Sequence, residues 1–504
     1  MSVHETEVLI IGGGVLGAAV ARELSKYKVD VTLVEKEVDF GWGITKANAA
    51  LVCQGMDCLT FRKEYYRSKL VWESIPMMEP LCKELDVPFK RIGQIAVFRD
   101  MGDIRPYSKV KARQEKWIPQ MGSHQVLDKE TLRNWEPNIS RKFIGALYDP
   151  VMAITDPVKL NIALAENAEQ NGVKTKLGTE VVGISPGVDE FEVQTNNGNI
   201  KSRFIVNAAG EQVDKIAAMV NADDFVVFPI KAQMWVLDKN VGGLVNHCVF
   251  AFVNDPPNMN LITPTVDGNL LIGVQLLLSD KRGDHSTSRE AAERAIRYAQ
   301  SLVPAISERD IIKSFASFIL FRNLETGWHE CIVRPSNSVP GLINVSIGFP
   351  GVSAAPATAK ELVRLLSDQG LKLVDNPNFN PHRKDIPDFS ELSNGEKNQL
   401  IVHDSRYAHV VCRCETVTEG EIVEAIKRIK AVGGLATVDG VKHRVRAGMG
   451  RCQSGFCRPR VISILANELG IPEEEVTMVG GKSRELLYKN KELLEEVNKI
   501  ATGS

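Results

Sequence analysis

The sequence predicts a chain of mixed class, with an α/β unit at its start, a β-rich α+β region in its middle and a small cysteine-rich domain at its end. Three observations lead to this prediction. Residues 7–36 follow a strand–turn–helix–strand pattern with glycines in the turn. Residues 225–335 alternate short apolar runs with turn residues. Four of the nine cysteines lie within residues 412–457, which indicates a site that binds through sulfur.

Length and composition limit the class of protein. A chain of 504 residues exceeds the size of one hydrophobic core, so two or three domains are expected. A hydrophobic content of 44%, a charged content of 25% and a net charge of −2 give no indication of a nucleic-acid or anionic-membrane partner. The sequence shows neither a transmembrane-length apolar run nor the features of a secretory signal. We therefore expect a cytoplasmic protein without a transmembrane segment.

The turn at residues 12–17 reads G-x-G-x-x-G inside a βαβ pattern of the Rossmann-like kind. Gly12 permits a tight turn, Gly14 lets the backbone approach a pyrophosphate, and Gly17 lets the helix pack on the strand. Glu35 ends the second strand, where a carboxylate accepts hydrogen bonds from an adenosine ribose. The spacing alone does not separate FAD from NAD. The residues predicted to bind the dinucleotide here are Gly12, Gly14, Val15, Gly17, Glu35 and Lys36.

The cysteine-rich segment has two close pairs, a C-x-C pair and a C-x4-C pair, separated by 37 residues. Helices predicted at residues 419–429 and 459–469 follow the two pairs, and a helix start favours thiolates and anionic clusters. Four thiolates fit a tetrahedral zinc ion or a [2Fe–2S] cluster, and buried structural cysteines are the third interpretation. The predicted ligands are Cys412, Cys414, Cys452 and Cys457.

The phrases "CRCETVTEGEI" and "RAGMGRCQSGFCRPRV" resemble the bacterioferritin-associated-ferredoxin-like domain. The resemblance implies that the four cysteines hold a [2Fe–2S] cluster rather than zinc. Several arginines crowd the same segment and either balance the anionic cluster or also raise its potential and mark a docking face. These arginines are Arg413, Arg446, Arg451, Arg458 and Arg460.

Residues 40–57 and the stretch "GFPGVSAAPATA" at residues 348–359 resemble a group of D-amino-acid-oxidase-like flavoproteins. That group includes the anaerobic glycerol-3-phosphate dehydrogenase catalytic subunits and the L-2-hydroxyglutarate dehydrogenases. The resemblance implies FAD rather than NAD, and a helix start near the flavin that stabilises negative charge on the reduced ring. Further FAD-contacting residues implied by it are Thr45, Lys46, Ala47, Ala49, Val181, Ala209, Gly210, Gly348, Gly351 and Val352.

The chain departs from this group at two polar positions. Gln54 stands where the group usually has His, and Ile319 stands where its Phe-Ala-Gly-Leu-Arg-Pro motif has an arginine that binds a substrate anion. The departures predict slow turnover of glycerol 3-phosphate, unless Arg322 or Arg334 reaches the pocket. The candidate catalytic residues are Gln54, Arg322 and His329.

The patterns also predict the domain boundaries. The oxidoreductase region covers residues 1–370, followed by a polar linker at 371–405 and a [2Fe–2S] domain with a terminal helix at 406–504. Within residues 1–370, the FAD-binding segments are expected at about 1–60, 150–220 and 335–370, and the substrate domain at about 61–149 and 221–334. Local patterns predict a helix at 59–85, a β pair formed by 89–93 and 94–98, and a helix at 482–500.

The resemblance implies a dehydrogenase that oxidises a small hydroxylated substrate, of the 2-hydroxy-acid or polyol-phosphate type, by hydride transfer to FAD. Electrons would leave through the cluster to a second flavoprotein or electron-acceptor subunit in a hetero-oligomer. Two alternatives stay open. The chain could oxidise a C–N bond, as amino-acid and opine dehydrogenases do, or it could be an electron-transfer subunit that serves the active site of a partner.

Overall fold

The computed structural model describes residues 4–53, 65–104, 116, 124–222, 225–251, 260–278, 281–321 and 331–487. The chain divides into two compact units, Met1–Asp385 and Ile386–Ser504. Each unit is described by itself. Residues 371–385, which the sequence analysis assigned to a linker, belong to the first unit.

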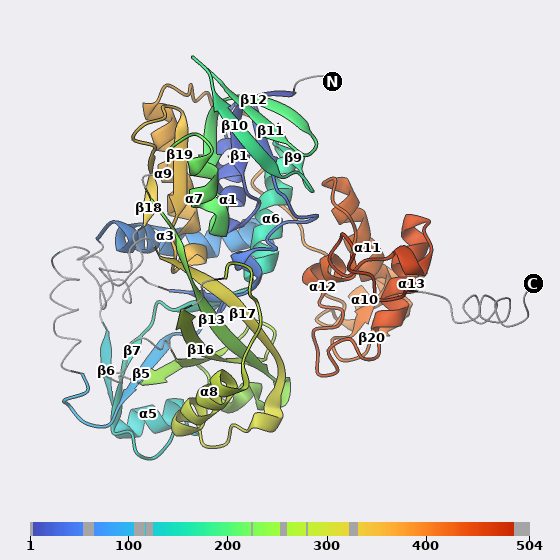
Figure 1. Ribbon diagram of the computed structural model, residues 1–504. Helices are drawn as coiled ribbons and strands as arrows, with labels where there is room; N and C mark the ends of the chain where they lie inside the picture. Colours follow the sequence, from blue (N-terminus) through green and yellow to red (C-terminus); the bar gives the residue numbers. More distant parts are fainter. Residues whose placement is uncertain are drawn as a thin grey trace, which may run out of the picture. The chain divides into compact units, whose positions relative to one another are not determined.

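A largely parallel sheet forms the nucleotide-binding part of the first unit (Figure 1). Its parallel strands lie in the order β19-β12-β1-β2-β9. Val8, Leu9 and Ile10 in β1 are fully buried, as expected for a strand covered on both faces. The strands are β1 (His4–Ile11), β2 (Val31–Val34), β9 (Lys174–Lys176), β10 (Val181–Pro186), β11 (Phe191–Thr195), β12 (Gly198–Asn207), β18 (Ile332–Pro335) and β19 (Leu342–Ser346).

Helices pack beside this sheet and bring distant parts of the sequence together. α1 packs against both α6 and α9, and α3 packs against α9. Asp156 caps α6 by accepting hydrogen bonds from the Val158 and Lys159 amides, as its position before a proline predicts. The helices are α1 (Val15–Leu24), α3 (Tyr65–Glu84), α6 (Pro157–Gln170), α7 (Val213–Ala218) and α9 (Gly351–Asp368).

A second, mainly antiparallel sheet has the strand order β17-β13-β16-β15-β14-β5-β7-β6, and α8 (Arg289–Leu302) packs against β16 and β13. The alternation of apolar runs with turn residues that the sequence shows from residue 225 onward corresponds to strands of this sheet, and residues 228–237 form one continuous strand. The strands are β5 (Gln94–Phe98), β6 (Gln125–Asp128), β7 (Gly145–Asp149), β13 (Phe228–Leu237), β14 (Cys248–Ala251), β15 (Leu261–Pro264), β16 (Leu270–Leu278) and β17 (Ile311–Phe321). α5 (Lys129–Trp135) packs against β6 and β7.

The predicted pairing of residues 89–93 with residues 94–98 was wrong. Both segments are strands, but β4 (Phe89–Arg91) pairs with β8 (Ala153–Thr155), whereas β5 pairs with β7 and β14. Gly93 lies between them with a φ of +68°, so the chain turns there and each strand joins a different sheet. β8 also pairs with β3 (Leu51–Val52).

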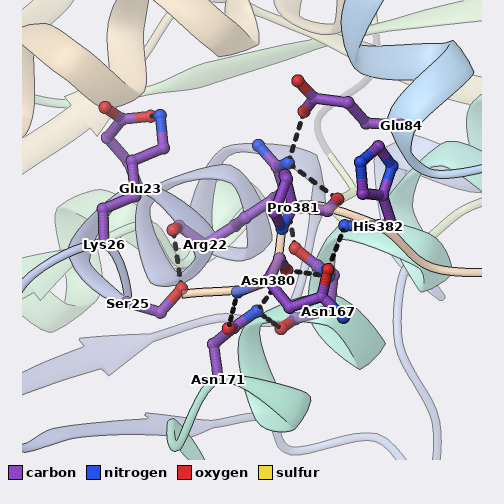
Figure 2. Close-up of polar contacts among 10 residues, drawn as sticks. All are labelled: Arg22, Glu23, Ser25, Lys26, Glu84, Asn167, Asn171, Asn380, Pro381 and His382. Atoms are coloured by element: carbon purple, nitrogen blue, oxygen red, sulfur yellow. Dashed lines mark hydrogen bonds and ion pairs between the residues drawn. The ribbon is translucent and has the colours of Figure 1, made fainter. Parts of the chain in front are cut away.

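Residues 371–385 run along the surface of the first unit, as the sequence analysis expected for this polar stretch. Figure 2 shows the contacts of Asn380 and Pro381 with α1 and α6. The Asn380 carbonyl accepts hydrogen bonds from the side-chain amides of Asn167 (3.0 Å) and Asn171 (2.9 Å). The Pro381 carbonyl accepts one from Arg22 (3.2 Å), whose guanidinium also forms an ion pair with Glu84 at 2.7 Å.

The second unit is a small helical domain with its own core. α11 (Glu419–Ala431), α12 (Val438–Val445) and α13 (Arg458–Leu469) pack together beside the short pair β20 (Val410–Cys412) and β21 (Val417–Thr418). Thr418 and Glu421 form a capping box at the start of α11. The predicted linker contains a helix that the sequence analysis did not predict, α10 (Asn394–His403), which begins at a second capping box between Ser393 and Glu396.

The predicted terminal helix lies mainly outside the described residues, and residues 482–487 are not helical. Among the described residues, no helix is both long enough and apolar enough to cross a membrane.

Candidate functional site

In the glycine turn between β1 and α1, Gly12 and Gly17 pack closely against backbone atoms, whereas Gly14 has open space beside it. Gly12 has a φ of +110°, and a Cβ added there would lie 2.5 Å from the Ala208 carbonyl oxygen. A Cβ on Gly17 would overlap the Gly12 carbonyl oxygen. A Cβ on Gly14 would meet only the Thr45 hydroxyl, at 3.3 Å. The space beside Gly14 is therefore available for a pyrophosphate, as the sequence predicted.

Polar contacts from distant residues fix the start of α1. The Val15 amide donates to the Thr45 hydroxyl at 3.1 Å, and the Gly13 carbonyl accepts hydrogen bonds from the Asn161 side chain (3.0 Å) and the Gly41 amide (3.1 Å). No acidic residue lies in the first turn of α1, so the positive end of the helix dipole is left for an anion. Asn161 was missed by the sequence analysis, because a polar residue within a helical pattern gives no local signal of this role.

Glu35 holds the same turn through its carboxylate. One oxygen accepts a hydrogen bond from the Gly13 amide at 2.7 Å, and the other accepts one from the Glu37 amide at 2.9 Å. Burial raises the pKa of Glu35, although both amide hydrogen bonds oppose the shift. Each carboxylate oxygen keeps a second lone pair that can accept a ribose hydroxyl. Lys36 is exposed and forms an ion pair with Glu37 at 3.6 Å.

Residues 42–53 form a loop that is tied to the start of α9. The Cys53 amide donates to the Ser353 hydroxyl at 2.9 Å, and Asn48 closes a turn by binding the Thr45 carbonyl and the Ala50 amide. The Lys46 ammonium lies 5.3 Å from the centre of the Trp42 ring. The loop also contains the buried Ala47 and the half-buried Ala49. The predicted flavin loop and the predicted flavin-facing helix start are therefore in direct contact.

Two strand ends complete this cofactor region. Asn207 at the end of β12 is fully buried and donates to the Asn344 side chain in β19 at 2.8 Å. Ala209 and Gly210 follow β12, and Gly348 follows β19 with a φ of +69°. A Cβ added to Gly43, Gly210 or Gly351 would meet no atom within 4 Å, so the predicted cofactor side of these segments is open. Val352 lies in the first turn of α9, and Val181 is the buried first residue of β10.

One face of the second sheet lies against the predicted flavin loop. The buried side chains of Ala232, Met234 and Val274 form a cluster on this face, with Ala49 packed against it. The cluster also includes Leu276, Phe315 and Ile319. Ile319, at the position of the resembled group's arginine, therefore lies on an apolar face beside the cofactor loop.

Ser317 is a polar exception on this face. It lies opposite Ala232 in the strand register. Ser317 is two residues from both Phe315 and Ile319 along the strand, so these side chains lie on the same face of the sheet. Ser317 is 4% exposed, and its hydroxyl has no hydrogen-bond partner among the described residues. The family motif has Gly at this position, which was a signal that the sequence analysis did not use. The candidate catalytic residues Gln54, Arg322 and His329 lie outside the described residues, whereas the half-buried Arg334 pairs in register with Asn344 in β19.

The four predicted cysteine ligands meet in the second unit. Cys412 and Cys457 are buried, whereas Cys414 and Cys452 are exposed. The sulfur atoms of Cys414 and Cys452 are 3.6 Å apart, close to the roughly 3.8 Å between two thiolates on one tetrahedral metal with metal–sulfur bonds of about 2.3 Å. A hydrogen bond from the Cys457 thiol lowers the pKa of Cys412 to about 6, and the amides of Gly448, Glu415 and Cys414 add to this shift.

The backbone around the cysteines adopts conformations that keep it close to the sulfur atoms. Thr416, Arg446, Gln453 and Ser454 all have positive φ, which is uncommon for residues with a side chain and is concentrated at functional sites. A Cβ on Gly450 would overlap the Cys414 side chain. Across the described residues, no group of three or more His, Cys, Asp or Glu side chains is placed to hold a metal ion. The cysteines instead approach one another in two pairs, Cys412 with Cys457 and Cys414 with Cys452, and paired thiolates fit a centre that contains two metal ions.

Comparison with known proteins identifies both units. Residues 7–365 match the family model of the FAD dependent oxidoreductases. The chain belongs to this family. Residues 410–467 match the BFD-like [2Fe-2S] binding domain. The predictions of a D-amino-acid-oxidase-like fold, of FAD rather than NAD, and of an iron–sulfur cluster rather than zinc are therefore confirmed, and the protein is an FAD-dependent oxidoreductase with a [2Fe–2S] domain.

Several relatives match most of the chain or its first part. The chain is 40% identical to a glycerol 3-phosphate dehydrogenase of Caloramator mitchellensis, over 93% of this chain and 96% of that protein. It is 23% identical to one subunit of the anaerobic glycerol-3-phosphate dehydrogenase of Escherichia coli, over 92% of this chain and 88% of that protein. The solved structure of the L-α-glycerophosphate oxidase of Mycoplasma pneumoniae, with FAD bound, superposes with a TM-score of 0.69 at 28% identity. That match covers 76% of this chain and 99% of the oxidase.

Proposed function

We propose that this oxidoreductase is a dehydrogenase for a polyol phosphate of the glycerol 3-phosphate type. The observation that carries the proposal is the 40% identity to a glycerol 3-phosphate dehydrogenase, because it extends over 93% of this chain. The similarity to the solved L-α-glycerophosphate oxidase supports the same substrate class for the first unit.

The chain supplies a separate set of groups for each task. The amides at the start of α1 bind the diphosphate of the dinucleotide, and Glu35 binds its ribose. The start of α9, whose first turn contains no acidic residue, stabilises negative charge at the flavin ring. FAD held by these segments would supply two-electron oxidation of an alcohol, and a [2Fe–2S] cluster would supply transfer of one electron at a time. The proposed cluster ligands are Cys412, Cys414, Cys452 and Cys457.

The position of the substrate phosphate is the open part of this proposal. Ile319 lies on the apolar cluster beside Ala49, so this position gives no cation for a phosphate. Taken alone, an isoleucine at position 319 predicts slow turnover of glycerol 3-phosphate. We give more weight to the similarity along the whole chain and propose that Arg322, His329 or Arg334 binds the phosphate instead. Gln54 stays the candidate for the contact that histidine makes in the resembled group.

Ser317 is proposed as a substrate-binding residue. Its buried hydroxyl has no partner in the part of the chain that the structure describes, and it shares a face with Ile319, next to the loop that contains Ala49. A buried hydroxyl without a partner is unfavourable, and a substrate hydroxyl or phosphate oxygen would give it one.

We also propose that the enzyme works in the cytoplasm as part of a hetero-oligomer with an electron-accepting subunit. The support for a partner is the similarity to a protein that is one subunit of an anaerobic dehydrogenase. The support for the compartment is the odd number of cysteines and the close C-x-C pair, which fit thiolates bound to metal in a reducing environment.

The test is anaerobic bleaching of the flavin absorbance by a panel of substrates. Glycerol 3-phosphate should bleach the flavin at a rate of about ten per second, typical of an enzyme with its own substrate. Glycerol, 2-hydroxy acids and amino acids serve as controls for the loss of phosphate and for the alternative substrate classes. Fast bleaching by an amino acid, with release of ammonia and no response to glycerol 3-phosphate, would overturn the proposal.

A further inference from the structure

An exposed aromatic ring lies between two arginines beside the cysteine site. Phe456 is 44% exposed, although it directly precedes the buried ligand Cys457. The Arg413 guanidinium lies 4.5 Å from the centre of its ring, and the Arg460 guanidinium lies 5.2 Å from it. Both arginines are exposed, so the three side chains form one surface patch, named here the Phe456 patch.

The two arginines of the patch differ from two others in the same segment. Arg446 forms an ion pair with Glu415 at 3.0 Å, and Arg458 forms one with Glu485 at 2.9 Å. Among the described residues, no carboxylate lies within ion-pair distance of Arg413 or Arg460. Their charges are therefore available to a partner, while the ring holds the guanidinium groups in place.

The patch adjoins the cysteine ligands along the chain. Arg413 stands between the ligands Cys412 and Cys414, and Arg460 lies in the first turn of α13, which starts directly after Cys457. Cys414 and Cys452 are the two exposed cysteines of the site. Electron transfer between proteins becomes slower with distance, so an acceptor that binds beside these cysteines would have a short path to a cluster held by them.

We infer that the Phe456 patch is the docking surface for an acidic protein that accepts one electron at a time from the cluster. Arginine and aromatic side chains contribute most of the binding energy in many interfaces, and a basic patch selects partners with an acidic surface. The inference rests on the proposed exit of electrons through the cluster, but it does not depend on the identity of the substrate.

The experiment measures electron transfer from chemically reduced protein. Full-length protein is reduced with dithionite, desalted without oxygen and mixed in a stopped-flow instrument with an acidic ferredoxin or with cytochrome c, a basic carrier. Charge reversal in Arg413→Glu/Arg460→Glu should lower the second-order rate constant for the acidic carrier at least about tenfold at low salt. The difference should shrink as salt rises, and the rate with cytochrome c should not fall.

The matched control is Lys427→Glu/Lys430→Glu, which makes the same change in charge near the end of α11. Lys427 lies 8 residues after Glu419, about 12 Å along the helix from its start, and Lys430 lies farther along. The control should keep the wild-type rate with the acidic carrier. Arg460 lies outside both cysteine pairs. If the double variant fails to assemble its cluster, Arg460→Glu alone should therefore still give part of the effect.

Several outcomes would overturn the inference. An equal loss in the control variant would mean that only net charge matters. A loss that persists at high salt, with a shifted cluster potential, would mean that the arginines tune the cluster rather than bind a partner. Slower transfer from flavin to cluster within the reduced chain would assign the patch to contact with the first unit. Because dithionite bypasses the substrate, failure of the glycerol 3-phosphate proposal would leave this experiment unaffected.

Discussion

The dinucleotide site and the cysteine site of this chain are assembled over very different lengths of sequence. The first, as proposed, joins Gly14 and Thr45 with Asn161 and Gly351, which together span most of the first unit. The second lies within residues 412–457 and has a small core of its own. The first site offers mainly backbone amides and open space beside glycines, whereas the second offers four side-chain sulfur atoms. A distributed site should therefore respond to changes in packing far away, and a local site should respond mainly to its own residues.

The largest expected effect comes from the glycine turn. Gly14→Leu should give folded protein without bound flavin, because its side chain would enter the space proposed for the pyrophosphate. Gly17→Ala should instead reduce stability as well as flavin content, since its methyl group would overlap the Gly12 carbonyl oxygen. Flavin absorbance per protein and thermal unfolding separate the two variants. A normal flavin content in Gly14→Leu would contradict the proposed site.

The second prediction tests the local site. Cys457→Ser should lose the cluster and slow electron transfer to an acceptor protein by much more than tenfold, while substrate still bleaches the flavin, because the two sites use separate residues. Iron content and visible spectra measure the first effect, and stopped-flow absorbance measures the second. Cys82→Ser is the control, since Cys82 is buried in the first unit and contacts Thr155. Zinc without iron in anaerobically purified wild-type protein would refute the assignment.

The third prediction concerns residues 371–385. Arg383 and Glu166 form a buried ion pair at 2.7 Å, with side chains 3% and 7% exposed. Arg383→Ala should lower the free energy of unfolding of the first unit by about 3–5 kcal/mol, because it removes the ion pair of a buried carboxylate. The cluster spectrum should not change.

Arg364→Ala is the matched control for Arg383→Ala. Arg364 forms ion pairs with two acids, Glu361 and Asp368, but its side chain is 56% exposed. Removing it should cost less than about 1 kcal/mol. Equal destabilisation in the two variants, measured by denaturant unfolding, would argue that residues 371–385 contribute no more than a surface contact.

The smallest effect is expected at Ser317. Ser317→Ala should raise the KM for substrate about fivefold, equivalent to about 1 kcal/mol, by removing one hydrogen bond. The melting temperature of the ligand-free protein should stay unchanged or rise, because no described residue gives the hydroxyl a hydrogen-bond partner. A lower melting temperature with an unchanged KM would assign Ser317 a structural role instead.

Local spacing was enough to predict the parts of each site that lie in one stretch of chain. The turn at Gly12–Gly17 and the two cysteine pairs were identified because their geometry depends on residues that are close in sequence. The helix predicted at residues 419–429 corresponds to α11, which begins at Glu419. The family resemblance then separated FAD from NAD and the cluster from zinc.

Only the tertiary structure decided which distant residues meet. The pairing of β4 with β8, the contact of Asn161 with Gly13 and the position of Ser317 beside Ala232 each join segments separated by many residues. Such contacts depend on strand order and helix packing, which local periodicity does not encode. The same holds for the Phe456 patch, because the sequence places five arginines near the cysteines, and only the fold distinguishes those that pair with Glu415 and Glu485 from those that stack on an exposed ring.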